Sequence, residues 1–274
     1  MFCEVRPIKT VIFFDVDNTI YANHANAVLP GTARLLRRLK ENPDVILGLA
    51  TGRGPNNLGV IKDILDLFEY QVLFNGAFVR KGDRVIHRKT ILKTDVEEVL
   101  DFVTSQNLSL GMVGEDGDAI NRNDHRVEEG MKVLRGRTPS VNPRFYRDHD
   151  IFALWVFSGD EKTHAGLAGR FPSFSVFPWH KAGADLTYRA NDKSEGIRRV
   201  LEELGEVRLI CVGDGANDIR MITMADVGIA MGNSRFSELK EKADHVAPHI
   251  ADDRLMSVFE HLGLIVPEDG PGRP

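Results

Sequence analysis

Two short acidic motifs in the chain could carry out phosphoryl chemistry. The first, DVDNTI, places Asp15 and Asp17 two residues apart, directly after the apolar run TVIFF. A carboxylate at the end of a strand can attack phosphorus and form an acyl phosphate, which divides one difficult step into two easier ones. The second carboxylate is close enough to protonate the departing alkoxide and later to accept a proton from water. The motif favours Asp15 as nucleophile and Asp17 as general acid and base, although ordinary turns also use Asp and Asn.

The second motif, GDGAND, is a tight glycine loop at residues 213–218 that carries two acids and an amide. Oxygen ligands suit Mg²⁺, which takes one or two carboxylates and completes its octahedron with water and substrate phosphate. We expect Asp214 and Asp218 to help bind Mg²⁺, because a phosphate dianion would otherwise be repelled by the surrounding acids. The alternatives are a helix N-cap or a weak calcium loop, and the spacing does not match an EF-hand.

Two further positions could hold a phosphoryl group. Thr51-Gly52-Arg53 follows another apolar run, and its hydroxyl and backbone N–H groups could bind phosphoryl oxygens. The ammonium of Lys193 could pair with the nucleophile and with the transferring group. Taken separately, the first segment is better explained as a plain turn, and the second is one lysine among many.

The order of the secondary-structure elements predicts how these residues meet. The first 80 residues alternate strand-length apolar runs with amphipathic helices, in the order TVIFFD, GTARLLRRLKEN, VILGLAT, NNLGVIKDILDLF and QVLFNG. This β-α-β-α-β order indicates a parallel sheet with helices on its faces, and the same alternation resumes after residue 190. Ligands in such sheets bind beyond the carboxyl ends of the strands, where the strand order reverses. We therefore expect four residues at one edge of the sheet: Asp15, Thr51, Asn75 and Asp214.

The middle of the chain has a different pattern. From about residue 80 it combines a hairpin, FVRKGDRVIHR, with short strands and helices of mixed α+β character. The predicted fold class is α/β: a three-layer, doubly wound parallel sheet at 1–80 and 188–274, with an inserted α+β cap domain at 81–187. Such a cap would close over the site, exclude water and contact the leaving group selectively.

One segment of the predicted cap could contact a substrate. We interpret residues 178–185, PWHKAGAD, as a polar, glycine-containing loop that could face the site, because loops often carry function. His180 and Lys181 are the candidates in this loop for contacts with the leaving group. Arg53, in the core, is a similar candidate.

Composition limits the class of protein. The chain has 274 residues, 42% of them apolar, which suits two domains with buried cores. The net charge is −5 and acidic and basic residues are well mixed, so the sequence has no basic cluster that would bind nucleic acid or an anionic membrane. The two cysteines, Cys3 and Cys211, are too few for a disulfide framework. With no signal-peptide pattern and no long apolar run, we expect a cytoplasmic protein.

Together the motifs resemble those of the haloacid dehalogenase superfamily of phosphohydrolases. Its four motifs are matched in order by DVDNTI at 15–20, TGR at 51–53, Lys193, and GDGAND at 213–218. The sequences NGA at 75–77 and AMGNS at 230–234, with the insertion between the second and third motifs, resemble the Cof-type group with a large α+β (type IIB) cap.

The resemblance implies a role for each matched residue. Asp15 would be the nucleophile and Asp17 the general acid and base. The phosphoryl group would be bound by Thr51, Gly52, Arg53, Lys193 and Asn217. Mg²⁺ would be held by Asp15, the backbone carbonyl of Asp17, Asp214, and Asp218 directly or through water. The family usually has Gly where this chain has Asn18, a change suited to a turn with left-handed backbone geometry.

The implied activity is Mg²⁺-dependent hydrolysis of a small phosphorylated metabolite, such as a sugar phosphate, through an aspartyl-phosphate intermediate. The protein would be a monomer or a small homo-oligomer. Two alternatives stay open: a phosphomutase or phosphotransferase that uses the same intermediate, and a non-catalytic ligand-binding protein of the same fold. A dinucleotide-binding protein is disfavoured because no G-x-G-x-x-G follows the first strand.

Overall fold

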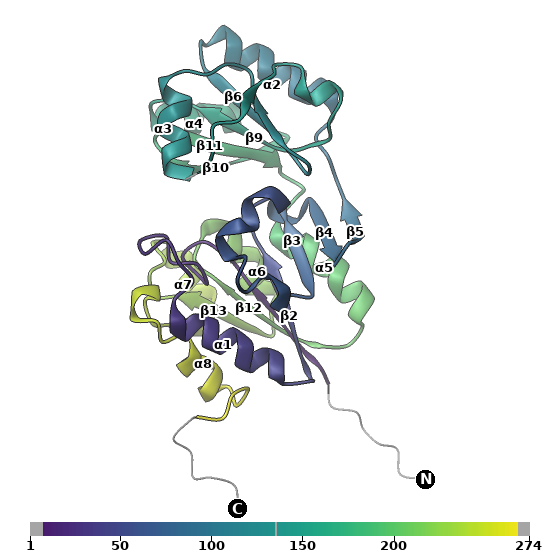
Figure 1. Ribbon diagram of the computed structural model, residues 1–274, viewed down its shortest axis with the longest axis vertical. Coiled ribbons are helices and arrows are strands. Elements are labelled where there is room, and N and C mark those ends of the chain that lie inside the picture. Colours follow the sequence, from purple (N-terminus) through teal and green to yellow (C-terminus); the bar gives the residue numbers. More distant parts are fainter. Residues whose placement is uncertain (1–7, 135, 268–274) are drawn as a thin grey trace, which may run out of the picture.

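The computed structural model describes residues 8–134 and 136–267, which form two sheets with helices packed against them (Figure 1). The larger sheet has eight strands in the order β14-β13-β12-β1-β2-β3-β4-β5. Neighbouring strands from β14 through β3 are parallel, and the hairpin β4–β5 adds two antiparallel strands at one edge. The strands are β1 (Thr10–Phe14), β2 (Val45–Ala50), β3 (Tyr70–Leu73), β4 (Phe78–Lys81), β5 (Arg84–Arg88), β12 (Arg208–Gly213), β13 (Val227–Met231) and β14 (His245–Ala247).

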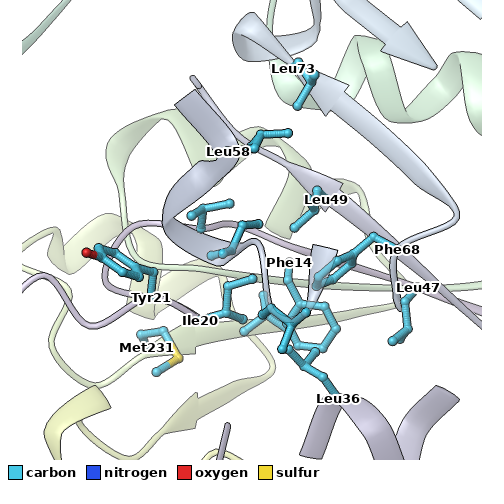
Figure 2. Close-up of a cluster of buried hydrophobic side chains, with 14 of the residues drawn as sticks. Phe14, Ile20, Tyr21, Leu36, Leu47, Leu49, Leu58, Phe68, Leu73 and Met231 are labelled. Carbon is cyan, nitrogen blue, oxygen red and sulfur yellow. The ribbon is translucent and has the colours of Figure 1, made fainter. Parts of the chain in front are cut away.

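Helices cover both faces of this sheet. On one face lie α1 (Pro30–Glu41) and α8 (Met256–His261), packed over a cluster that includes Phe14, Leu36 and Leu47 (Figure 2). On the other face lie α5 (Lys193–Leu204), α6 (Ile219–Met224) and α7 (Ser237–Lys242), packed over a cluster that includes Phe13 and Val200. Successive residues of β1 thus face opposite layers, as a strand buried on both sides requires. The predicted three-layer, doubly wound α/β core is confirmed.

The strand order reverses at β1. The chain moves outward from β1 through β2 and β3 on one side, and through β12, β13 and β14 on the other. β1 and β12 are parallel neighbours, and the backbone N–H of Asp15 donates to the carbonyl of Val212 at 2.9 Å. The carboxyl ends of these two strands therefore lie side by side at the position where ligands bind in such sheets.

The smaller sheet, called the cap sheet below, has six strands in the order β10-β11-β9-β6-β7-β8. Its pairs are antiparallel except for β7 with β8. The strands are β6 (Ser109–Gly114), β7 (Asp118–Ile120), β8 (Ser140–Val141), β9 (Ile151–Phe157), β10 (Phe174–His180) and β11 (Gly183–Tyr188), and the helices are α2 (Lys93–Ser105), α3 (His125–Leu134) and α4 (Glu161–Arg170).

The two faces of the cap sheet have different neighbours. Side chains from α2 and α4, such as Val99 and Leu167, share one apolar cluster with Val156 of β9. The next residue of β9, Phe157, belongs instead to a cluster that continues into the core. In that second cluster the ring of Phe152 stacks on Phe74 of the core, with ring centroids 4.9 Å apart. The second face of the cap sheet is therefore the one directed toward the core.

Two predicted elements differ from the structure. The hairpin β4–β5 belongs to the eight-stranded sheet, because β4 pairs with β3 (Tyr70 opposite Lys81), so the sheet continues past the predicted boundary at residue 80. The expected helix at 56–68 is instead two 3₁₀ helices, η1 (Pro55–Ile61) and η2 (Leu65–Leu67). Its buried residues, Leu58, Ile61, Ile64 and Phe68, have a spacing that an α-helix would also bury, and Gly59 within the segment disfavours a continuous α-helix.

Four more short 3₁₀ segments join the main elements: η3 (Phe74–Gly76), η4 (Phe145–Arg147), η5 (Ala216–Asp218) and η6 (Ile250–Asp252). Two of them, η3 and η5, lie in loops that follow core strands and carry residues of the predicted site. Among the helices of the described residues, none has the length and apolar character that crossing a membrane would require.

Candidate active site

Three carboxylates converge at the carboxyl ends of β1 and β12. Asp15, Asp214 and Asp218 each offer an oxygen atom, and these atoms all lie within 4.8 Å of one another. Asp218 is fully buried because its loop folds back on itself. Its Oδ2 accepts hydrogen bonds from the backbone N–H groups of Asp214 (2.9 Å) and Gly215 (2.8 Å). The acid at the end of the motif thus fixes the loop that presents Asp214.

Lys193 lies between two of these acids. Helix α5 begins at Lys193 because the side chain of Asp192 caps it, accepting from the backbone N–H groups of Ser194 and Glu195. The buried Nζ of Lys193 donates to Asp15 Oδ1 and to Asp218 Oδ1, each at 2.5 Å. Burial alone would lower the pKa of Lys193, but the two carboxylates raise it well above its ordinary value, so the ammonium keeps its charge.

The acids carry more negative charge than one lysine balances. Burial raises the pKa of Asp15 to about 7, and the Asp218 and Asp17 carboxylates add to this effect while Lys193 opposes it. Burial, followed by repulsion from Asp15 and Asp218, raises the pKa of Asp214 to about 8. An additional cation would relieve this repulsion.

The free oxygens fit a hard divalent cation. Both oxygens of Asp218 already accept hydrogen bonds, whereas Asp15 Oδ2 and Asp214 Oδ1 receive none from the described residues. Two carboxylates with free oxygens are the protein ligands that Mg²⁺ usually takes. The donor set therefore fits Mg²⁺, with Asp218 better suited to holding Lys193 and the loop than to direct coordination.

Arg53 holds the second carboxylate of the first motif. Its Nε and one terminal nitrogen donate to the two oxygens of Asp17, each at 2.8 Å, and its other terminal nitrogen donates to the carbonyl of Asn57. The two-point contact fixes both the position and the plane of the Asp17 carboxylate. Burial would lower the pKa of Arg53, but the Asp17 side chain raises it above its ordinary value.

Thr51 lies at the end of β2, where it is almost fully buried. Its Oγ1 accepts from the backbone N–H of Arg53 at 3.2 Å, which leaves the hydroxyl hydrogen available to a ligand. The neighbouring Gly52 faces the amide of Asn75, which would lie 3.3 Å from an added Cβ. The structure thus brings the second motif to the same edge of the sheet as Asp15.

Two asparagines to which the sequence analysis assigned no chemical role, Asn75 and Asn233, connect the loops of the site. Asn75 has φ +52 and accepts a hydrogen bond from Asn217 at 2.9 Å, so the amide of Asn217 contacts Asn75. Asn233 donates to the carbonyl of Asn18 at 2.9 Å. Asn75 was expected at this edge because it follows a predicted strand, whereas the family resemblance of the AMGNS segment was the one signal for Asn233. Asn18 has φ +54, the left-handed geometry expected of it.

The segment at residues 178–185 is not a loop. It comprises the end of β10, a short turn and the start of β11, and an irregular register between Pro178 and His180 accommodates the proline. His180 Nδ1 accepts from the backbone N–H of Ala182 at 3.2 Å, within the turn. The exposed Lys181 lies 3.7 Å from Glu129 of α3. Within the part of the chain that the structure describes, neither side chain forms a hydrogen bond or ion pair with the acids of the site.

Comparisons with known proteins agree with this arrangement. The family model described as haloacid dehalogenase-like hydrolase matches residues 12–259. The Bacillus subtilis protein "Putative phosphatase YkrA" is 31% identical over 260 residues, which cover 93% of this chain and 98% of that protein. A solved structure of a hypothetical protein from Geobacillus kaustophilus superimposes with a TM-score of 0.85 at 26% identity, over 94% of this chain and all of the other.

A second solved structure, of the HAD subclass IIB sugar phosphatase BT4131, superimposes with a TM-score of 0.82 over 94% of this chain and all of the other. At 23% identity this match supports the fold, including the cap, and not the substrate.

Proposed function

Because the chain belongs to the haloacid dehalogenase-like hydrolase family, as a Cof-type phosphatase, we propose that it hydrolyses a small phosphorylated metabolite with Mg²⁺ through an aspartyl-phosphate. The observation that carries this proposal is the position of Lys193, whose ammonium contacts both Asp15 and Asp218 beside the free oxygens of Asp15 and Asp214. A buried cation between acids at a strand switch point is suited to bringing a phosphate dianion to a carboxylate nucleophile.

In the first half-reaction, one carboxylate oxygen of Asp15 attacks phosphorus while Lys193 pairs with the same carboxylate. The new bond joins Asp15 to the phosphoryl group, and the bond from phosphorus to the leaving oxygen breaks. Asp17 carries a proton in this step, on an oxygen that Arg53 must release, and gives that proton to the leaving oxygen. In the second half-reaction, Asp17 takes a proton from water, the water oxygen attacks phosphorus, and inorganic phosphate leaves as Asp15 is restored.

The remaining groups bind and orient the phosphoryl group. Mg²⁺ on Asp15, Asp214 and the backbone carbonyl of Asp17 would neutralise the charge of the phosphate and orient it. The hydroxyl hydrogen of Thr51 and the backbone N–H of Gly52 are donors for phosphoryl oxygens. Asn217, held by its hydrogen bond to Asn75, would line the same pocket for the phosphoryl group.

We propose further that the inserted cap domain begins after β5 and ends near residue 187. It would move against the core, exclude water during phosphorylation and contact the leaving group. The cytoplasmic location, the absence of nucleic-acid and membrane partners, and a monomeric or small homo-oligomeric state stay predictions of the sequence.

Hydrolysis of p-nitrophenyl phosphate tests the chemistry. We expect activity with Mg²⁺, none in excess EDTA, and a loss on the order of 10³-fold or more in Asp15→Asn. Asp101→Asn, the same change at an exposed position of α2, should keep full activity. Acid-quenched wild-type enzyme should carry phosphate on the peptide that contains Asp15. Activity in EDTA, or undiminished turnover by Asp15→Asn, would rule out the mechanism.

A further inference from the structure

The cap sheet carries a carboxylate, Asp185, on the face directed toward the core. The adjacent residue of β11, Leu186, packs in the cluster beneath α2 and α4, so Asp185 lies on the opposite face. Figure 1 shows β10 and β11 on the side of the cap toward the core. Burial raises the pKa of Asp185 to about 7, and the negative charge of Asp17 adds to this effect.

Asp185 is held rigidly by one neutral donor. The indole Nε1 of Trp179 donates to Asp185 Oδ1 at 3.0 Å. Trp179 is itself fixed, because its ring fills the space next to Gly183 and meets the edge of Phe157, with ring centroids 6.3 Å apart. Among the described residues no lysine or arginine pairs with Asp185, and its Oδ2 receives no hydrogen bond. The guanidinium of Arg53 donates its hydrogen bonds to Asp17 and to the carbonyl of Asn57.

A half-buried carboxylate without a cation partner is unfavourable in the resting protein. Asp185 is only partly exposed, and Trp179 occupies one of its two oxygens. The other oxygen, on the face of the cap sheet directed toward the core, is open to a donor from a ligand.

Building on the proposed function, we propose that Asp185 determines specificity: it accepts a hydrogen bond from a hydroxyl group of the leaving group and repels leaving groups that carry a negative charge. The substrates it favours are phosphate monoesters of uncharged polyhydroxy compounds, such as sugars or sugar alcohols. A carboxylate acceptor suits their hydroxyl donors, and the charge of Asp185 adds to that of Asp17 against an anionic leaving group.

The test compares kcat/KM for wild type and Asp185→Asn, which keeps an acceptor for Trp179 and removes the charge. The substrates are glucose 6-phosphate and sorbitol 6-phosphate, with uncharged polyhydroxy leaving groups, 3-phosphoglycerate, with an anionic one, and p-nitrophenyl phosphate, which has no hydroxyl donor on its leaving group. Asp101→Asn is the matched control at an exposed position of the cap.

For the sugar or sugar alcohol phosphate that wild type hydrolyses faster, we expect kcat/KM to fall about tenfold to a hundredfold in Asp185→Asn, the range for a hydrogen bond to a charged group. The value for 3-phosphoglycerate should rise, and that for p-nitrophenyl phosphate should stay within about threefold. If the preference between uncharged and anionic leaving groups is the same in both proteins, or if wild type hydrolyses neither sugar phosphate, the inference is wrong. In either case, Mg²⁺-dependent hydrolysis of p-nitrophenyl phosphate by wild type would still support the proposed function. If wild type does not hydrolyse p-nitrophenyl phosphate, the proposed function itself is wrong.

Discussion

Without divalent cations, this protein should have a lower free energy of unfolding near pH 8 than near pH 5. Asp15 and Asp214 have folded-state pKa values of about 7 and about 8, first because they are buried and then because neighbouring acids repel them. An unfolded aspartate titrates near ~4. Between these limits the folded chain holds protons that the unfolded chain has released. The contribution of these two protonated acids to stability is therefore fully present below about pH 4. It is lost as the pH rises through their folded-state pKa values.

The size of the loss follows from the two shifts. They amount to about three and about four pKa units, and each unit corresponds to about 1.4 kcal/mol. The two acids raise each other's pKa, so part of the same repulsion enters both shifts and they do not add in full. We expect the free energy of unfolding to fall by about 3–5 kcal/mol between pH 5 and pH 8, a large part of the stability of an ordinary domain.

Urea unfolding in EDTA near pH 5 and near pH 8 measures this loss. Millimolar Mg²⁺ should restore stability at the higher pH and have little effect at the lower, because protonated carboxyl groups bind the ion poorly. Asp214→Asn should lose about half of the pH dependence and most of the Mg²⁺ response, whereas Asp101→Asn should keep both. A metal-free stability that is flat or rises over this range would refute the reasoning, as would an undiminished Mg²⁺ response in Asp214→Asn.

Two further substitutions test how the site is positioned. Arg53→Lys should lower kcat for p-nitrophenyl phosphate about tenfold with little change in stability, because lysine cannot make the two-point contact with Asp17. An unchanged kcat would show that this contact does not position the acid. Phe152→Ala should lower the free energy of unfolding in urea by about 3 kcal/mol, because the buried ring joins the cap to Phe74 and Phe78 of the core. Phe152→Leu should cost less, and a loss below about 1 kcal/mol in the alanine variant would contradict the packing argument.

The parts of the fold that depend on local sequence were predictable. The buried strands β1 and β12 each end in an acidic motif, and the alternation of strands with helices sets the strand order that brings Asp15 and Asp214 together. The left-handed backbone of Asn18 was also predictable, because few residues other than glycine accept that geometry. These features follow from short segments and from the general rules of parallel sheets.

The errors come from features that a local pattern does not determine. The amphipathic pattern of residues 56–68 predicted an α-helix, but the segment forms two short 3₁₀ helices, and Gly59 within it disfavours a continuous α-helix. The hairpin β4–β5 has the alternation of any antiparallel pair, and only its pairing with β3 assigns it to the core. Pro178 and Gly183 made residues 178–185 resemble a loop, although Pro178 sits at an irregularity in the register of β10.

The contrast between Asp15 and Asp185 explains why one could be found from sequence and the other could not. Asp15 follows a run of five buried residues, so an acid at that position departs from the local pattern and is visible without coordinates. Asp185 lies in a short polar hairpin where an acid is common, and its place on the face of the cap sheet directed toward the core appears only in the folded structure. In both places the resting protein leaves a carboxylate without enough partners. The partner that is missing differs: a cation fits between Asp15 and Asp214, whereas a neutral hydroxyl donor fits Asp185, whose charge would otherwise add to that of Asp17. The same electrostatic reasoning thus predicts metal binding in the core and selection of an uncharged leaving group in the cap.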